Sequence, residues 1–209
     1  GEVNSYRQIC IDKNIYQDTP ERITREVTPI DWEKFRGKDI LGDLKPEILL
    51  CNGTYNRNAV WLRKKYQRWD EVAKLLTERG LRVGSVGLNS EYIHGTEDFT
   101  GIGILNTYDL ISRCRLFVSN DTGLYHFANA IGKDNIVIFT ASSVAKNYDP
   151  VFHRFSTVIR GDWLAECNYC QNDNGIRGKK WHSCDFWKCC YFNPMQIVKI
   201  VEEKLNGKQ

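Results

Sequence analysis

The 209-residue sequence contains no apolar run long enough to cross a bilayer and no stretch with the pattern of a signal peptide. It also lacks a strong charge of either sign, because the net charge is +3 and lysine and arginine are spread along the chain. Nucleic-acid binding needs a more concentrated basic surface, so this class is excluded. No repeat or low-complexity segment occurs. With 42% hydrophobic and 26% charged residues, the sequence is typical of an ordinary soluble protein.

The length of the chain allows one sizeable core, which favours a single domain with appendages over two domains. Because the sequence begins at Gly1 rather than at a methionine, we expect a domain excised from a longer protein or a trimmed tag.

Short apolar runs alternate with helical patterns between positions 47 and 160. The expected strands are 48–51, 81–86, 115–119 and 135–140, and the expected helices are 69–79, 108–114 and 122–131. This alternation predicts an α/β fold, a Rossmann-like parallel sheet with helices on both faces. Ligands of such sheets bind outside the C-terminal ends of the strands. Asp70 and Thr107 are the predicted N-caps of the first two helices.

Two appendages flank this Rossmann-like unit of residues 47–160. Residues 1–46 are polar and weakly periodic, which predicts a linker or N-terminal extension with a short helix near 29–35. Residues 161–209 contain a cysteine-rich segment, followed by a C-terminal helix that begins after Asn193-Pro194.

The most informative stretch lies between positions 117 and 132 and reads FVSNDTGLYHFANAIG. It predicts a buried strand, a polar turn and a helix, with Asp121, Thr122 and Gly123 at the helix N-terminus. Backbone N–H groups there have no partner within the helix and attract anions. His126 lies four residues after Thr122, on the same side of the helix. Each residue alone is read as a cap, a packing glycine or an ordinary histidine, but together they indicate a site for a diphosphate-linked ligand.

The order Asn-Asp-Thr-Gly, two residues, His, then Ala-x-Ala-x-Gly resembles the donor-site signature of family-nine glycosyltransferases. These are the bacterial heptosyltransferases of lipopolysaccharide synthesis and their relatives. The resemblance extends from about residue 47 to 205 and implies the C-terminal, donor-binding half of a GT-B glycosyltransferase. The acceptor-binding N-terminal domain, which supplies the catalytic base, would be missing, so no residue of this chain is assigned as catalytic.

The resemblance also implies the partners of the site. The donor would be a nucleotide-diphosphate sugar, ADP-heptose-like, and the acceptor a lipopolysaccharide, another glycan, a lipid-linked acceptor or a protein. No active-site metal would be needed. The implied location is cytoplasmic, with peripheral attachment to the inner membrane as an alternative.

The resemblance implies a role for each residue of the motif. The backbone amides of Thr122 and Gly123, with the Thr122 hydroxyl, would hold the donor diphosphate. Asp121 would orient hydroxyl groups of the donor sugar or ribose. His126 would help to neutralise the leaving diphosphate or line the sugar pocket.

Two other expected strand ends carry candidate donor contacts. Gly53 and Thr54 follow the first strand, where a glycine allows a ligand to approach the backbone closely. Glu91 follows the second strand and is a candidate for a ribose hydroxyl, although a loop glutamate is commonly just solvated.

A lysine before the helix 69–79 is the candidate phosphate contact, because its ammonium acts as a point charge. Family members carry a Lys-x-Trp-Pro-like segment there, and this chain matches it only in part from Lys65 to Asp70. Lys65 is the predicted contact, with Lys64 and Arg68 as open alternatives.

Five of the eight cysteines lie close together in the pattern C-x2-C-x13-C-x4-C-C. Such spacing suits a structural zinc or iron ion held by four thiolates. The predicted ligands are Cys167, Cys170, Cys184 and Cys189, with Cys190 as the alternative to Cys189. Disulfides and free thiols are the other interpretations. Elsewhere, Cys51 and Cys114 adjoin apolar segments and are predicted to be buried free thiols.

Two functions compete with the transferase. One is a non-catalytic module that binds a nucleotide or nucleotide sugar, because a fold can keep a ligand site without its chemistry. The other is a metal–thiolate domain that mediates assembly, with the α/β unit as its scaffold.

Overall fold

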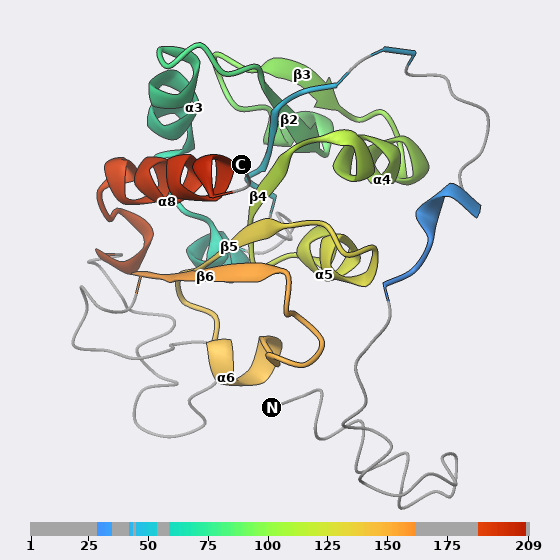
Figure 1. Cartoon of the computed structure of the whole chain (residues 1–209). Coiled ribbons are helices and arrows are strands. Elements are labelled where there is room, and N and C mark those ends of the chain that lie inside the picture. Colours follow the sequence, from blue (N-terminus) through green and yellow to red (C-terminus); the bar gives the residue numbers. More distant parts are fainter. Residues whose placement is uncertain (1–28, 35–41, 44, 54–58, 162–187, 208–209) are drawn as a thin grey trace, which may run out of the picture.

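The computed structural model describes residues 29–34, 42–43, 45–53, 59–161 and 188–207. Its centre is a six-stranded sheet in the order β3-β2-β1-β4-β5-β6, and every neighbouring pair is parallel (Figure 1). The strands are β1 (Ile48–Cys51), β2 (Val83–Gly87), β3 (Glu97–Thr100), β4 (Leu116–Asn120), β5 (Asn135–Phe139) and β6 (Ser156–Arg160). The predicted Rossmann-like α/β fold is confirmed.

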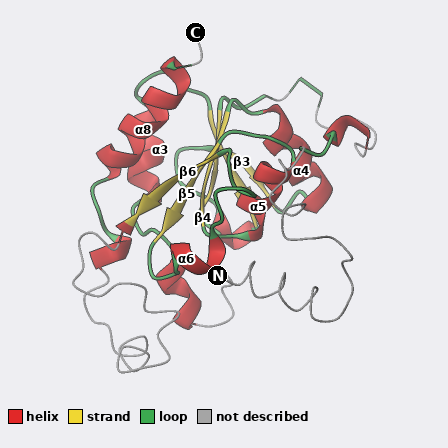
Figure 2. Ribbon diagram, turned by 60° about the horizontal axis from the view of Figure 1, so that its bottom comes forward, coloured by secondary structure: helices red, strands yellow, loops and turns green. Residues whose placement is uncertain are grey.

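Helices cover both faces of the sheet, as Figure 2 shows. One face carries α3 (Trp69–Thr77) and α8 (Pro194–Asn206), and the other carries α4 (Ile104–Arg113) and α5 (Gly123–Ala130). Successive side chains of each strand point to opposite faces of the sheet. Thus Ile48 and Leu50 pack in the core beneath α3 and α8, whereas Leu49 packs in the core beneath α4 and α5. The central strands are fully buried, as parallel strands covered on both faces must be.

The two edge strands, β3 and β6, were not expected from the sequence. Both contain polar residues, Glu97-Asp98 in β3 and Ser156-Thr157 in β6, and neither has a continuous apolar run. The pattern that identifies a buried strand is therefore absent. Pairing with β2 and β5 makes these segments strands, because the backbone groups of each edge strand complete the hydrogen-bond ladder of its neighbour.

The helix termini correct two predictions. The predicted cap Thr107 is wrong, because α4 begins one turn earlier and the Thr107 hydroxyl donates to the Gly103 carbonyl at 3.0 Å. Asp70 lies in the first turn of α3, behind an N-cap at Arg68. Thr122 caps α5, where its Oγ1 accepts the Leu124 N–H at 3.3 Å. A polar side chain near a helix start thus indicates the helix but not its first residue.

Five shorter helical segments complete the described residues, and two of them are the 3-10 turns η3 (Asn89–Glu91) and η6 (Lys188–Cys190). The expected helix near 29–35 is the 3-10 turn η1 (Trp32–Lys34), whose Trp32 ring packs edge-on against Tyr108 and Phe127. The 3-10 segment η2 (Ala59–Lys64) precedes α3, and α6 (Val144–Asn147) lies between β5 and β6. No helix within the described ranges is both long and apolar enough to cross a membrane.

Candidate functional site

A cavity of about 670 Å³ opens at the carboxyl ends of β1, β2 and β4. This is the position at which the strand order of the sheet reverses, because β1 is followed by β2 on one side and lies against β4 on the other. The lining residues are Cys51, Gly53, Lys64, Gly87, Leu88, Glu91, Gly101, Gly103, Ile104, Thr107, Asp121, Thr122, Gly123 and Leu124. The topology therefore brings the predicted strand-end residues Gly53, Glu91 and Asp121 to a single cavity.

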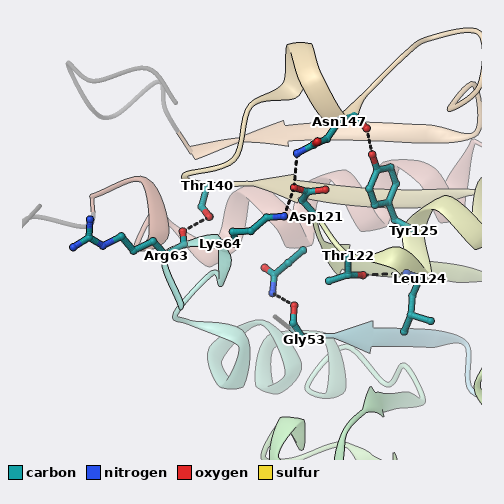
Figure 3. Close-up of polar contacts among 10 residues, drawn as sticks. Gly53, Arg63, Lys64, Asp121, Thr122, Leu124, Tyr125, Thr140 and Asn147 are labelled. Atoms are coloured by element: carbon teal, nitrogen blue, oxygen red, sulfur yellow. Dashed lines mark hydrogen bonds and ion pairs between the residues drawn. The ribbon is translucent and has the colours of Figure 1, made fainter. Parts of the chain in front are cut away.

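An ion pair between Lys64 and Asp121 lies at the polar end of the cavity (Figure 3). Lys64 Nζ is 2.7 Å from Asp121 Oδ2, and the two side chains are 15% and 4% exposed. Of the three basic residues considered for a phosphate contact, Lys64 lines the cavity, and Lys65 and Arg68 do not. Arg68 instead pairs with Glu71 on the surface.

The backbone on which Lys64 lies is fixed by its neighbour. The Arg63 carbonyl accepts the Thr140 hydroxyl at 2.6 Å and the Ala141 N–H at 3.3 Å, both just beyond β5 (Figure 3). The Cys190 thiol donates to the same carbonyl at 3.2 Å. These three donors hold η2 against the sheet edge, so the Lys64 side chain starts from a defined position.

The N-terminus of α5 forms the adjoining wall. Thr122 and Gly123 both line the cavity, and a Cβ built on Gly123 would meet no atom within 4 Å. A ligand can therefore approach this backbone closely. The Leu124 N–H is capped by Thr122, but the N–H groups of a helix start have no partner within the helix, and together with the helix dipole they favour an anion at this position.

Glu91 closes the other polar wall, where β1 and β2 end. Its side chain is 5% exposed, and Oε2 accepts the Leu88 N–H at 2.8 Å. A Cβ on Gly53 would lie 2.8 Å from Glu91 Oε2, and one on Gly87 would overlap the same atom. The two glycines thus make room for this carboxylate. The structure places Glu91 on the wall of the cavity, where the sequence predicted a ribose contact.

Cys51 lines the cavity, but its thiol is in an environment that does not favour reactivity. Burial raises the pKa of its thiol to about 12, and the charge of Glu91 also raises it. A thiolate nucleophile needs the opposite environment. Cys51 and Cys114 are both buried and free, as predicted.

His126 lies beside the cavity rather than on its wall. The residue as a whole is exposed, but one side of the ring is covered, because its Nδ1 is 2.7 Å from Nε2 of the buried His153. Burial and the proximity of His153 lower the pKa of His126 to about 4, against an opposing effect of Asp121. Burial also lowers the pKa of His153. At neutral pH both rings are therefore uncharged.

These two histidines make the stability of the fold dependent on pH. The unfolded chain protonates them near pH 6.5, whereas the folded chain keeps them neutral to lower pH. Below pH 6.5 the unfolded state binds more protons, so the free energy of unfolding should fall between pH 7 and pH 4. We expect urea denaturation to show a smaller free energy of unfolding at pH 5 than at pH 7.5. In the double variant His126→Gln/His153→Gln, the free energy of unfolding should fall less between pH 7.5 and pH 5 than in the wild type. An equal fall in both proteins would contradict the assignment of the pH dependence to these two histidines. His94→Gln serves as the control for an exposed histidine.

Two asparagines in the site were missed by the sequence reasoning. Asn120 is fully buried at the end of β4, where its Oδ1 accepts the Tyr66 N–H at 3.0 Å and its Nδ2 donates to the Gly53 carbonyl at 3.4 Å. Asn147 Nδ2 donates to Asp121 Oδ2 at 2.9 Å (Figure 3). Asn120 belongs to the motif and was available as a signal, whereas nothing in the sequence around Asn147 indicates its contact.

Several predicted residues lie outside the described part of the chain. These are Thr54, Cys167, Cys170 and Cys184. Cys189 and Cys190 are described as buried free thiols whose sulfur atoms are 3.8 Å apart. Within the described ranges, no group of three or more histidine, cysteine or acidic residues could hold a metal ion. The predicted zinc or iron site therefore gains no support.

Comparison with known proteins relates part of this chain to one family of enzymes. Residues 101–174, which include α5 and its N-terminal motif, match the model of glycosyltransferase family 9 (heptosyltransferase). This part of the chain is therefore similar to glycosyltransferase family 9. The curated lipooligosaccharide heptosyltransferase 2 of Haemophilus ducreyi is 25% identical to it over 142 residues, which are 61% of this chain and 40% of that protein.

Solved structures of bacterial glycosyltransferases share the fold of this chain. The iron-containing dodecameric heptosyltransferase TibC of E. coli, in complex with ADP-D-beta-D-heptose, has a TM-score of 0.59 at 15% identity, over 87% of this chain and 49% of that one. E. coli heptosyltransferase WaaC with ADP has a TM-score of 0.55 at 14% identity, over 79% and 46% of the two chains. The family 9 glycosyltransferase of Veillonella parvula has a TM-score of 0.56 at 15% identity, over 85% and 49%. The domain thus matches about half of a GT-B heptosyltransferase.

Proposed function

We propose that this chain is the donor-binding half of a glycosyltransferase that uses a nucleotide-diphosphate sugar, ADP-heptose-like, as its donor. The observation that carries the proposal is the cavity in which Lys64, Asp121 and the N-terminus of α5 converge at the switch point of the sheet. The family match and the ADP and ADP-heptose named for two structural neighbours support this choice of donor.

The two ends of the cavity suit different parts of such a donor. Its volume of about 670 Å³ is within the range typical of small-molecule sites. At the polar end, the diphosphate would lie between Lys64 and the first turn of α5. Glu91 would accept hydrogen bonds from ribose hydroxyls, and the apolar side chains of Leu88 and Ile104 would flank the base.

The proposed role of these groups is to stabilise charge as the sugar leaves its diphosphate. The acceptor oxygen would attack the anomeric carbon of the sugar, the bond from that carbon to the diphosphate would break, and the acceptor proton would pass to a base. The Lys64 ammonium and the helix dipole face the developing negative charge of the diphosphate. In this proposal they supply the positive charge in place of a divalent metal.

The base and the acceptor site are assigned to a part of the enzyme beyond this chain. The chain spans 40% of its curated relative and about half of the solved structures. We therefore expect the isolated chain to bind the donor and to transfer sugar poorly or not at all. Acceptors in the proposal are lipopolysaccharide, another glycan, a lipid-linked glycan or a protein.

Calorimetric titration with ADP, UDP and GDP tests the proposal. We expect saturable binding of ADP in the presence of EDTA, because the positive charge is assigned to Lys64 and the helix. Asp121→Ala should weaken this binding about tenfold, because it removes the carboxylate that fixes Lys64 in a charge-assisted contact. It should leave the domain folded, as judged by circular dichroism.

Two outcomes would contradict the proposal. Binding of none of the three nucleotides would exclude a donor site that works in the isolated chain. Equal affinities of the wild type and Asp121→Ala would place the nucleotide elsewhere. A chain that binds ADP-sugar but stays inactive when its N-terminal half is restored would be a non-catalytic binding module.

A further inference from the structure

The segment from α6 to β6 braces the first turns of α5. The Tyr125 hydroxyl donates to the Asn147 carbonyl, and Asn147 Nδ2 donates to Asp121 Oδ2 at 2.9 Å. His153, six residues beyond Asn147, contacts His126 through the 2.7 Å separation of Nε2 and Nδ1. Two motif residues, Asp121 and His126, are therefore each held by a residue from this segment.

The hydrogen bonds of His153 determine which of its nitrogens carries the proton. The Asp149 N–H donates to His153 Nδ1 at 2.9 Å. The Asp149 carbonyl is 3.1 Å from the same nitrogen; it also accepts the His153 backbone N–H at 2.8 Å, and a carbonyl oxygen can accept two hydrogen bonds. A proton on Nδ1 would face the Asp149 N–H, whereas a lone pair there accepts it. The shorter of these two contacts to Nδ1 is the one from the Asp149 N–H, and it assigns the proton of His153 to Nε2.

The same reasoning fixes the tautomer of His126. Nε2–H of His153 points at His126 Nδ1, which must accept it, so the proton of the neutral His126 ring lies on Nε2. Among the described residues, this Nε2 has no hydrogen-bond partner. His126, an exposed residue whose ring is covered on the His153 side, thus presents an N–H donor near the N-terminus of α5.

We propose that His153 is a positioning residue of the donor site, because its hydrogen bond to His126 Nδ1 directs the His126 Nε2–H toward the diphosphate-linked sugar. This inference rests on the proposed function for the identity of the ligand. His153 acts through His126 and touches no ligand itself. An imidazole held in this tautomer donates one directed hydrogen bond, whereas an unrestrained ring can also present a lone pair that repels an anionic oxygen.

The surrounding charges agree with an uncharged His126. Asp121, which precedes the N-cap of α5, favours the charged ring, whereas Lys64 from η2 and His153 from the neighbouring segment oppose it. Tyr125 and Tyr148 pack against His153, and Asp149 favours the charged form of that ring. Burial outweighs the acidic groups for both histidines. The dipole at the start of α5 also disfavours a positive charge there.

Nitrogen NMR of the ligand-free, ¹⁵N-histidine-labelled protein tests the tautomer directly. In the wild type we expect His126 to show the Nε2–H tautomer and to remain neutral down to pH 5. In His153→Phe, which keeps an aromatic ring against Tyr125 and Tyr148, His126 should populate both tautomers and titrate closer to pH 6.5. An Nδ1–H tautomer in the wild type, or an identical His126 titration in both proteins, would overturn the inference.

Two further variants separate positioning from folding. His153→Gln retains an amide N–H donor and should restore the His126 tautomer at least in part. His94→Phe makes the same substitution at an exposed histidine outside the cavity and should change nothing at His126. If His153→Phe fails to fold, the wild-type spectrum and His153→Gln still decide the question.

A binding measurement then links the tautomer to the ligand. ADP-ribose is the probe, because its diphosphate diester does not titrate between pH 5.5 and 7.5. We expect His153→Phe to bind it about fivefold more weakly than the wild type at pH 7.5, the effect of one lost hydrogen bond. The wild type should keep a nearly constant affinity between pH 7.5 and pH 5.5, because burial is the main reason why its His126 stays neutral.

Equal affinities of the wild type and His153→Phe for ADP-ribose would overturn the role of His153 in binding. Failure of the wild type to bind ADP-ribose at all would instead overturn the proposed function. The NMR experiment needs no ligand, so it would still test the tautomer of His126 independently of the proposed function.

Discussion

Replacing Lys64 by alanine should weaken ADP binding about 10- to 100-fold. A charge-assisted hydrogen bond to phosphate contributes roughly 1.5–3 kcal/mol, and about 1.4 kcal/mol corresponds to a factor of ten in affinity. The substitution also leaves Asp121, which is 4% exposed, without its 2.7 Å partner at the position that would receive the diphosphate. The uncompensated carboxylate repels the diphosphate, so the loss of ADP affinity should be nearer 100-fold than 10-fold. Isothermal titration calorimetry measures it.

Lys65→Ala is the matched control for this prediction. The two lysines are adjacent in sequence and equal in charge, but only Lys64 lines the cavity. Lys65→Ala should change the affinity less than twofold, and both variants should keep the circular dichroism spectrum of the wild type. A larger loss for Lys65→Ala than for Lys64→Ala would restore the choice made from the sequence and refute the placement of Lys64.

Replacing Gly87 by alanine should lower the free energy of unfolding by about 2–4 kcal/mol, because strain and overlap add. Gly87 has a φ of +140°, which a residue with a Cβ rarely adopts. Its new methyl group would also overlap Glu91 Oε2, which is buried and bonded to the Leu88 N–H. The same displacement should weaken ADP binding, since Glu91 lines the cavity. Urea denaturation and calorimetry measure the two effects.

Gly95→Ala separates strain from overlap. Gly95 has a φ of +85°, and a Cβ there would meet no atom within 4 Å. Gly95→Ala should therefore lower the free energy of unfolding by only about 1 kcal/mol, because backbone strain is its only contribution. Adding Glu91→Ala to Gly87→Ala should recover part of the excess. Equal losses for Gly87→Ala and Gly95→Ala would show that Glu91 does not occupy the position described.

The proposed phosphate contact shows how the fold converts a weak sequence signal into a specific one. Lys64, Lys65 and Arg68 are equivalent in the sequence, and the family pattern favours the second of them only in part. The choice depends on η2, whose Arg63 carbonyl is held by Thr140 from beyond β5. That residue lies 77 positions away in the sequence. The contact is decided by the packing of two strand ends and not by local pattern.

The sequence by itself determined the α/β class, the four central strands and the site at their carboxyl ends. Buried parallel strands are continuous apolar runs, and the Asp121-Thr122-Gly123 turn after one of them predicts an anion-binding helix start. These features are local, so they can be read from neighbouring residues. The position of Glu91 followed from the same rule, because the sheet topology brings strand ends together.

The tertiary structure alone decided the rest. The polar edge strands β3 and β6 form only because β2 and β5 offer unpaired backbone groups. The contact between His126 and His153 joins residues 27 positions apart, and that between Asn147 and Asp121 joins residues 26 apart. Such contacts depend on how the segment after β5 folds back over α5. No periodicity or spacing encodes that path, because it is determined by the packing of the whole sheet edge.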